Sequence, residues 1–173
     1  DDHQELLRAY RSDLHECLQQ AIAICIQARL DRLNRRCPAD SMAYQKALAL
    51  FHCEGMSMGQ IAQHIGRQNQ VQVTRLLQLS KLRNAVRDWV LPQLQTRVKA
   101  HCLQYVSAEQ LELMAEQLNQ VLAEEVDQML QAYAREIQTG QGHRCSLFAC
   151  QVRAVINRSG RSQNTPDRNP FVC

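Results

Sequence analysis

Apolar residues recur along most of the chain at the three- and four-residue spacing of amphipathic α-helices. The longest such run predicts one long helix over residues 4–34, which ends before a break at residues 37–41. A second run predicts a helix over residues 42–53, and Gly55 is expected to close it. Only a few short runs are rich in β-branched residues, so we expect an all-α protein.

Capping residues mark the helices that follow. Ser57 stands three residues before Gln60, which is the spacing of a capping box, and predicts a short helix that Gly66 ends. A longer helix is expected to start at or just after Asn69 and to run to Trp89.

The rest of the chain repeats these signals. Pro92 is expected to start another helix, because proline suits the first helical position. Ser107 begins a second capping box, which predicts a long acidic helix to about Ile137. Ser146 is expected to cap a last helix to about Asn157, and a loosely ordered polar tail should follow.

The stretch from residue 44 to residue 90 has the pattern of a helix-turn-helix. In this motif a short helix and a tight turn position a second helix so that it can enter a groove of DNA. Ala62 is small enough for close approach of the second helix, and Ile61 and Ile65 flank it as core anchors. Gly66 permits the positive φ that a tight turn requires.

The second helix of this motif carries exposed polar side chains suited to DNA. Asn and Gln pair with adenine, Arg pairs with guanine, and Lys or Arg neutralise phosphates. The residues expected to contact bases are Gln68, Asn69, Gln70, Gln72, Thr74, Arg75 and Gln78. Those expected to contact phosphates are Arg67, Lys81, Arg83 and Arg87.

This motif resembles the C-terminal helix-turn-helix of sigma-70-type bacterial RNA polymerase sigma factors. The resemblance covers roughly residues 41–90 and rests on Glu54, Gly55, Ser57, Ile61, Ala62, Ile65, Gly66, Lys81, Leu82 and Arg83. It implies a bacterial transcription regulator whose residues 68–78 read promoter DNA, with RNA polymerase as a further partner. The Val at position 73 lies one place later than in that family, so we expect a turn that is one residue longer or differently shaped.

Charge divides the chain in a way that fits double-stranded DNA as the partner. Lys and Arg outnumber Asp and Glu by eight to two in residues 41–106, whereas Asp and Glu lead by seven to one in residues 107–137. The acidic helix could therefore fold over the basic segment and compete with DNA. The expected organisation is an N-terminal long helix at 1–40, the sigma-like domain at 41–106, the acidic helix plus a short helix at 107–158, and the tail at 159–173.

A protein-interaction module is the main alternative: an all-α adaptor or sigma-like decoy that binds RNA polymerase or another regulator. The long helices also carry apolar stripes that could pair between two copies of the chain, so a homodimer is a further partner compatible with the sequence. The eight cysteines lack the close pairing of zinc ligands, and no catalytic constellation or phosphate loop is visible. We therefore expect no metal, no cofactor and no enzyme activity.

Neither a secretory signal nor an apolar run near the ~20 residues of a membrane span is visible. The expected location is the cytoplasm, with reduced thiols and no membrane partner. The chain begins with Asp1 rather than Met, which is compatible with a piece of a longer protein.

Overall fold

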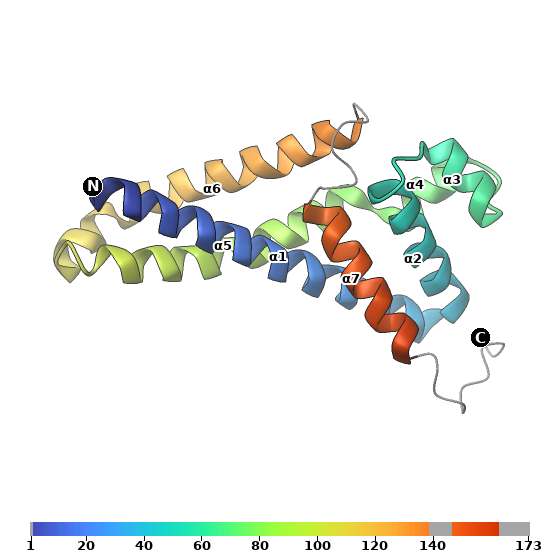
Figure 1. Cartoon of the computed structure of the whole chain (residues 1–173), viewed down its shortest axis with the longest axis horizontal. Coiled ribbons are helices and arrows are strands. Elements are labelled where there is room, and N and C mark those ends of the chain that lie inside the picture. The colour runs from blue at the N-terminus through green and yellow to red at the C-terminus, as the bar shows by residue number, and fades with distance from the viewer. Residues whose placement is uncertain (1, 139–146, 163–173) are drawn as a thin grey trace.

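In the computed structural model, residues 2–138 and 147–162 are described, and within these ranges the chain forms α-helices and no strand (Figure 1). The all-α expectation is thus confirmed. The helices are α1 (Asp2–Arg36), α2 (Pro38–His52), α3 (Met58–Ile65), α4 (Gln70–Leu77), α5 (Leu79–Cys102), α6 (Ala108–Gln138) and α7 (Leu147–Ser162).

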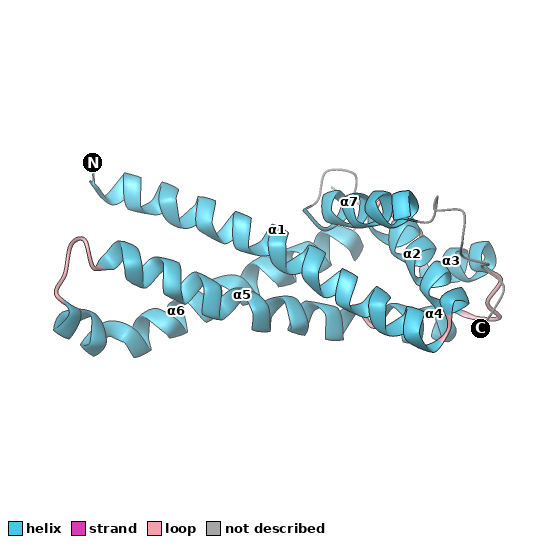
Figure 2. Ribbon diagram, turned by 90° about the horizontal axis from the view of Figure 1, so that it is seen from below, coloured by secondary structure: helices cyan, strands magenta, loops and turns pink. Residues whose placement is uncertain are grey.

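The three long helices form an elongated arm. Helix α5 packs against both α1 and α6, and the turn between α5 and α6 lies at the same end as the N-terminus (Figures 1 and 2). Helices α2, α3 and α4 gather at the opposite end. Helix α7 packs against α1 and α2, so the last helix of the described chain contacts the first.

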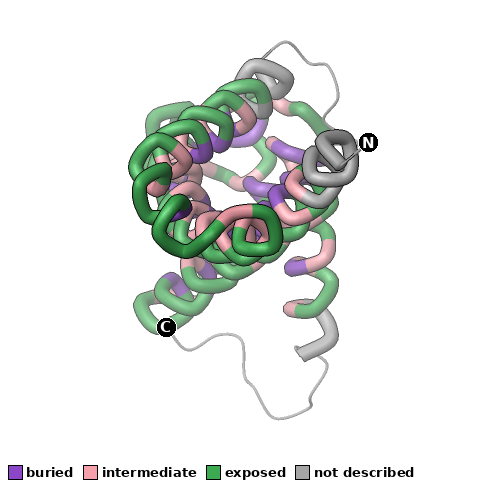
Figure 3. The backbone as a smooth tube through the Cα atoms, turned by 90° about the vertical axis from the view of Figure 1, so that its left-hand side faces the viewer, coloured by how far each residue is buried: buried purple, intermediate pink, exposed green. Residues whose placement is uncertain are grey.

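One cluster of buried side chains connects all of these helices. Its centre is the seam between α1 and α5, where Leu18 and Ile22 of α1 and Val86, Val90 and Leu94 of α5 are fully buried. The buried positions face inward and the exposed ones lie on the outside of the helices (Figure 3). The helical spacing of apolar residues therefore identified the correct faces of these two helices.

Helix α2 begins four residues earlier than the sequence predicts. Cys37 has extended backbone angles, and Pro38 is the first helical residue. Proline fits there because the first N–H groups of a helix have no partner within the helix, and its ring already holds a helical φ. The break between the first two helices is therefore Cys37 alone, not residues 37–41.

The expected helix from Asn69 to Trp89, with a new start at Pro92, is wrong. The chain breaks at Gln78, which has a left-handed backbone (φ 46°), and α5 then continues through Pro92. Proline has no N–H to donate to the carbonyl four residues earlier, which is that of Asp88. Pro92 lies on the exposed side of α5, so water can donate to this carbonyl instead. We call the bend between α4 and α5 at Gln78 the α4–α5 elbow.

The capping predictions agree with the structure at both capping boxes and at Gly66, whereas the C-cap of α2 is Cys53 rather than Gly55. Both capping boxes form: Ser57 and Ser107 each accept a hydrogen bond from the backbone three residues on, at 3.2 Å. Helix α7 continues to Ser162, past the expected end at Asn157 and into the predicted tail. The expected cap Ser146 and the tail from residue 163 lie outside the described residues.

Two glycines of the α3 region should respond to substitution with opposite signs. A Cβ at Gly66 would meet no atom, but the residue has φ 71°, a left-handed conformation that strains any residue with a Cβ. Gly66→Ala should therefore lower the free energy of unfolding by about 1 kcal/mol. Gly59 lies within α3 and also has open space, so Gly59→Ala should raise that free energy by about 0.5 kcal/mol. Urea unfolding followed by circular dichroism measures both. A stabilising Gly66→Ala would contradict the left-handed cap.

Candidate nucleic-acid interface

Local hydrogen bonds define the α3–α4 pair. Ser57 and Gln60 exchange two hydrogen bonds at the start of α3, of 3.0 and 3.2 Å. Gly66 ends α3 in the left-handed conformation, and the Asn69 side chain caps α4 by accepting a hydrogen bond from the Gln72 N–H at 3.1 Å. Backbone groups at the end of α3 and at the start of α4 thus have hydrogen-bond partners within the turn. These bonds fix the direction in which α4 leaves the turn.

Apolar side chains attach one face of each short helix to the core. Ile61 and Ala62 of α3 are buried, as are Val73 and Leu77 of α4. Ala62 leaves room for α4 to pack closely, as the sequence predicts. Because Val73 and Leu77 are four residues apart, they occupy one side of α4, and the opposite side faces away from the protein.

The exposed surface of α4 is what we call its outer face: Gln70, Val71, Thr74 and Arg75. Val71 and Arg75 lie opposite the buried side, Thr74 lies beside them, and Gln70 is exposed in the first turn although it shares the side of Val73 and Leu77. Three of these residues were predicted to contact bases. Val71 was missed, and its side chain is 50% exposed on an otherwise polar surface. Its signal in the sequence was an apolar residue out of register with Val73 and Leu77, and an exposed methyl group of this kind suits the methyl group of thymine.

The remaining predicted base contacts lie elsewhere. Gln68 is exposed in the turn, and its N–H donates to the Gln72 Oε1 at 3.1 Å. The side chains of Asn69 and Gln72 are therefore both engaged in holding the turn. Gln78 is half-buried at the α4–α5 elbow and lines a cavity rather than the outer face. The structure thus places the predicted residues on the outer face of α4, in the turn before it and at the elbow after it.

Two of the predicted phosphate contacts are already paired with carboxylates. Arg67 contacts Asp40 of α2 at 3.1 Å, and Arg87 contacts Asp127 of α6 at 2.5 Å. Arg83 lies 3.4 Å from the Ser80 hydroxyl, and Lys81 is exposed.

The acidic helix reaches only one of the basic residues it was expected to cover. Asp127 pairs with Arg87, but within the described residues no ion pair joins α6 to Arg75, Lys81 or Arg83. The sequence between Gly55 and Arg87 contains no Asp or Glu at all. The surface around α4 is therefore positively charged apart from the Asp40 and Asp127 pairs.

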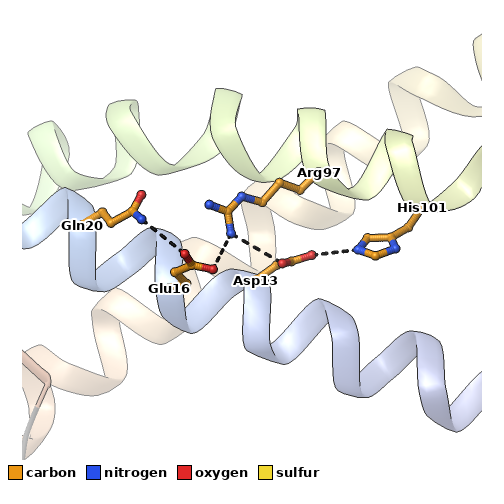
Figure 4. A network of polar contacts seen from close by, with 5 residues as sticks. All are labelled: Asp13, Glu16, Gln20, Arg97 and His101. Carbon is orange, nitrogen blue, oxygen red and sulfur yellow. Dashed lines mark hydrogen bonds and ion pairs between the residues drawn. The ribbon is translucent and has the colours of Figure 1, made fainter.

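The other polar cluster of note connects α1 to α5 (Figure 4). Arg97 of α5 contacts Glu16 at 2.8 Å and Asp13 at 3.5 Å, and Asp13 also contacts His101 at 3.2 Å. Each group in the network has a partner of opposite charge or a hydrogen bond. The network therefore links α1 to α5 along the elongated arm, remote from α4.

The described ranges hold no group of three His, Cys, Asp or Glu side chains placed to bind a metal ion. In the same part of the chain, none of the helices combines the length and apolar character that crossing a membrane requires. His52, which adjoins Cys53 in the sequence, is buried between aromatic rings, and it stacks on Phe148 at 5.3 Å between centroids.

Comparisons of the chain with protein-family models, with curated proteins and with solved structures find no match.

Proposed function

We propose that this protein is a DNA-binding transcription regulator, in which the α3–α4 pair is a helix-turn-helix and α4 enters the major groove. The observation that carries the proposal is the outer face of α4. It presents Gln70, Thr74 and Arg75 together with the exposed methyl groups of Val71, on a surface free of carboxylates other than those paired with Arg67 and Arg87.

The chemistry of this face matches what the edges of base pairs offer in the major groove. Gln70 has the donor and acceptor that adenine requires, and Arg75 has the paired donors that guanine accepts. Lys81 and Arg83 continue the positive surface along α5, where DNA phosphates would follow a helix seated in the groove. Gln72 and Asn69 support this surface by fixing the turn, so we assign them a positioning role rather than a base-reading role.

The resemblance of residues 41–90 to the promoter-reading domain of sigma factors is in line with this proposal, and it would make bacterial RNA polymerase a second partner. Binding to random duplex DNA at two salt concentrations is the first test. The logarithm of the affinity should fall with the logarithm of salt concentration, with a slope of about −0.9 for each phosphate contacted. Absence of binding at low salt would exclude the proposal.

Replacing Arg75 by Ala should weaken binding to a selected DNA site by about 1–3 kcal/mol, because a paired contact to guanine is lost in a desolvated groove. Arg11→Ala is the matched control: Arg11 is also an exposed arginine, but it belongs to the N-terminal third of α1, and the N-terminus lies at the end of the molecule away from α3 and α4 (Figure 1). Fluorescence anisotropy with a labelled duplex measures both. Equal affinities of the two variants would contradict the assignment of α4.

A protein-interaction module remains the second candidate because of α6. Leu113 is 87% exposed, and Met114 and Val121 of the same helix are also largely exposed. Such apolar side chains on one helix favour a protein partner, whether a second copy of the chain, RNA polymerase or another regulator. Substituting Leu113 and Val121 by Ser should abolish such an association and leave the salt-dependent binding of DNA unchanged.

A further inference from the structure

A cavity of about 460 Å³ lies where α1, α2 and the α4–α5 elbow meet. Arg29, Arg32 and Arg36 line it from α1, Tyr44 from α2, and Gln78 and Lys81 from the elbow and the first turns of α5. The three arginines follow the spacing of one helical face, three and four residues apart. We propose that this cavity binds the phosphate group of a small phosphorylated molecule.

The charge of the cavity is the first argument. Four cationic side chains line it and no Asp or Glu does. Among the described residues, none of these four cations has a carboxylate within ion-pair distance, although Arg67, Arg87 and Arg97 each have one. Like charges gathered around one space repel each other unless an anion joins them, and arginine is the residue that best matches the paired oxygens of phosphate.

The second argument is the presence of buried polar atoms without partners. The hydroxyl of Tyr44, a fully buried residue, has no hydrogen-bond partner, and neither does the buried Nε of Arg29. Both are donors, and the Arg29 guanidinium lies over the Tyr44 ring at 5.8 Å. Neither atom is exposed to the cavity in the free protein, so a ligand would reach these donors only after a small shift of the side chains around them. Because the two donors have no partner, such a contact would break no existing hydrogen bond of theirs.

The Tyr44 hydroxyl is suited to donate. Burial raises its pKa to about 12, although the charges of Arg29 and Arg32 act in the opposite direction. It therefore keeps its proton at neutral pH and could give it to a phosphate oxygen as a hydrogen bond. Arg29 also donates to the Leu76 carbonyl at 3.5 Å, which holds its head group beside the end of α4.

The size of the cavity indicates a ligand larger than inorganic phosphate. Its volume falls in the ~300–1,000 Å³ range typical of small-molecule sites. Leu77 and Leu82 give it an apolar wall, which suits an uncharged part of the ligand next to the phosphate. This site goes beyond the proposed binding of DNA, although Gln78 and Lys81 place it directly after α4.

Isothermal titration of the full chain with inorganic pyrophosphate, in a buffer free of phosphate, tests the proposal. We expect saturable binding, which Arg32→Ala and Arg36→Ala each weaken roughly tenfold or more, because each removes a charged hydrogen bond. Arg35→Ala is the matched control: Arg35 is exposed like Arg32 and Arg36 and lies in the same turn of α1, but it does not line the cavity. Its affinity should match that of the wild type.

Two results would overturn the proposal. One is an absence of pyrophosphate binding, and the other is an equal loss in Arg35→Ala, which would mean a general attraction to the basic end of α1. A competition with duplex DNA separates the two sources of phosphate. If Arg32→Ala and Arg36→Ala weaken DNA binding while pyrophosphate fails to bind, the phosphate belongs to DNA and the small-molecule site is refuted.

Tyr44→Phe is a second variant that keeps the shape of the core. It removes only the unpartnered hydroxyl, so it should weaken pyrophosphate binding without lowering the thermal midpoint of the free protein. An unchanged affinity would refute the role of the hydroxyl in the site. Arg75→Ala, on the outer face of α4, should leave pyrophosphate binding intact, so failure of the DNA proposal and failure of this one give different results.

Discussion

Replacing Ile22 by Ala is expected to lower the free energy of unfolding by about 2–5 kcal/mol. Ile22 is 0% exposed on α1, at the seam with α5 that forms the centre of the core. The substitution removes buried methyl and methylene groups and leaves a space that the surrounding helices fill only in part. A loss of this size is a large share of the ~5–15 kcal/mol that stabilises most domains.

The neighbouring Ile24 provides the control. It lies on the same helix but is 47% exposed, so Ile24→Ala should change the free energy of unfolding by no more than about 0.5 kcal/mol. Urea unfolding of both variants, followed by circular dichroism at 222 nm, measures the difference. Equal losses would mean that α1 has a different rotation about its axis, and the core as described would be wrong.

The second large effect is a loss of stability in acid that depends on His52. Its ring is 2% exposed and both ring nitrogens lack a hydrogen-bond partner. Burial therefore lowers its pKa to about 4, because the charged imidazolium would lose its hydration without gaining a partner. In the unfolded chain the pKa returns to about 6.5.

The direction of the pH effect follows from these two values. Between about pH 6.5 and pH 4 the unfolded state binds a proton at His52 that the folded state excludes, so stability falls as the pH falls through this window. The stabilisation that comes from keeping His52 neutral is fully present above about pH 6.5. Below about pH 4 the folded protein binds the proton too, so the loss of stability no longer grows. It amounts to about 2–3 kcal/mol between pH 7 and pH 4.

His52→Phe isolates this contribution. Each variant is compared with itself at pH 7, so any change in packing cancels, and the wild type should lose about 2–3 kcal/mol more than His52→Phe on acidification to pH 4. His64→Ala removes an exposed histidine instead and should retain the acid sensitivity of the wild type. Parallel pH profiles for wild type and His52→Phe would show that His52 is accessible to protons in the folded state.

The sequence was sufficient to predict the helices whose signals are local. The spacing of apolar residues located α1 and α6, and the capping boxes at Ser57 and Ser107 located the starts of α3 and α6. These features depend on side chains within a few residues of one another. The outer face of α4 could be predicted in part for the same reason, since Val73 and Leu77 had to be buried.

The features that the sequence did not reveal depend on contacts between distant segments or on an unusual backbone. Gln78 is not a residue type that normally adopts a left-handed conformation, so nothing local predicted the elbow. Pro92 resembled a helix start but lies within α5. Basic residues at the end of α1 suit the negative end of the helix dipole and so give no sign of a site by themselves. Only the packing of α1 beside α5 brings Arg32 and Arg36 near Lys81.

The contact between α7 and α1 has a consequence for how the protein is made. A ribosome adds roughly 5–20 residues per second, and α1 emerges long before Leu147. The apolar face of α1, including Leu18, thus has no α5 or α7 to cover it while most of the chain is being translated. The nascent chain should therefore be a client of chaperones that hold exposed apolar helices, and a ribosome stalled before α7 should release a species prone to aggregation.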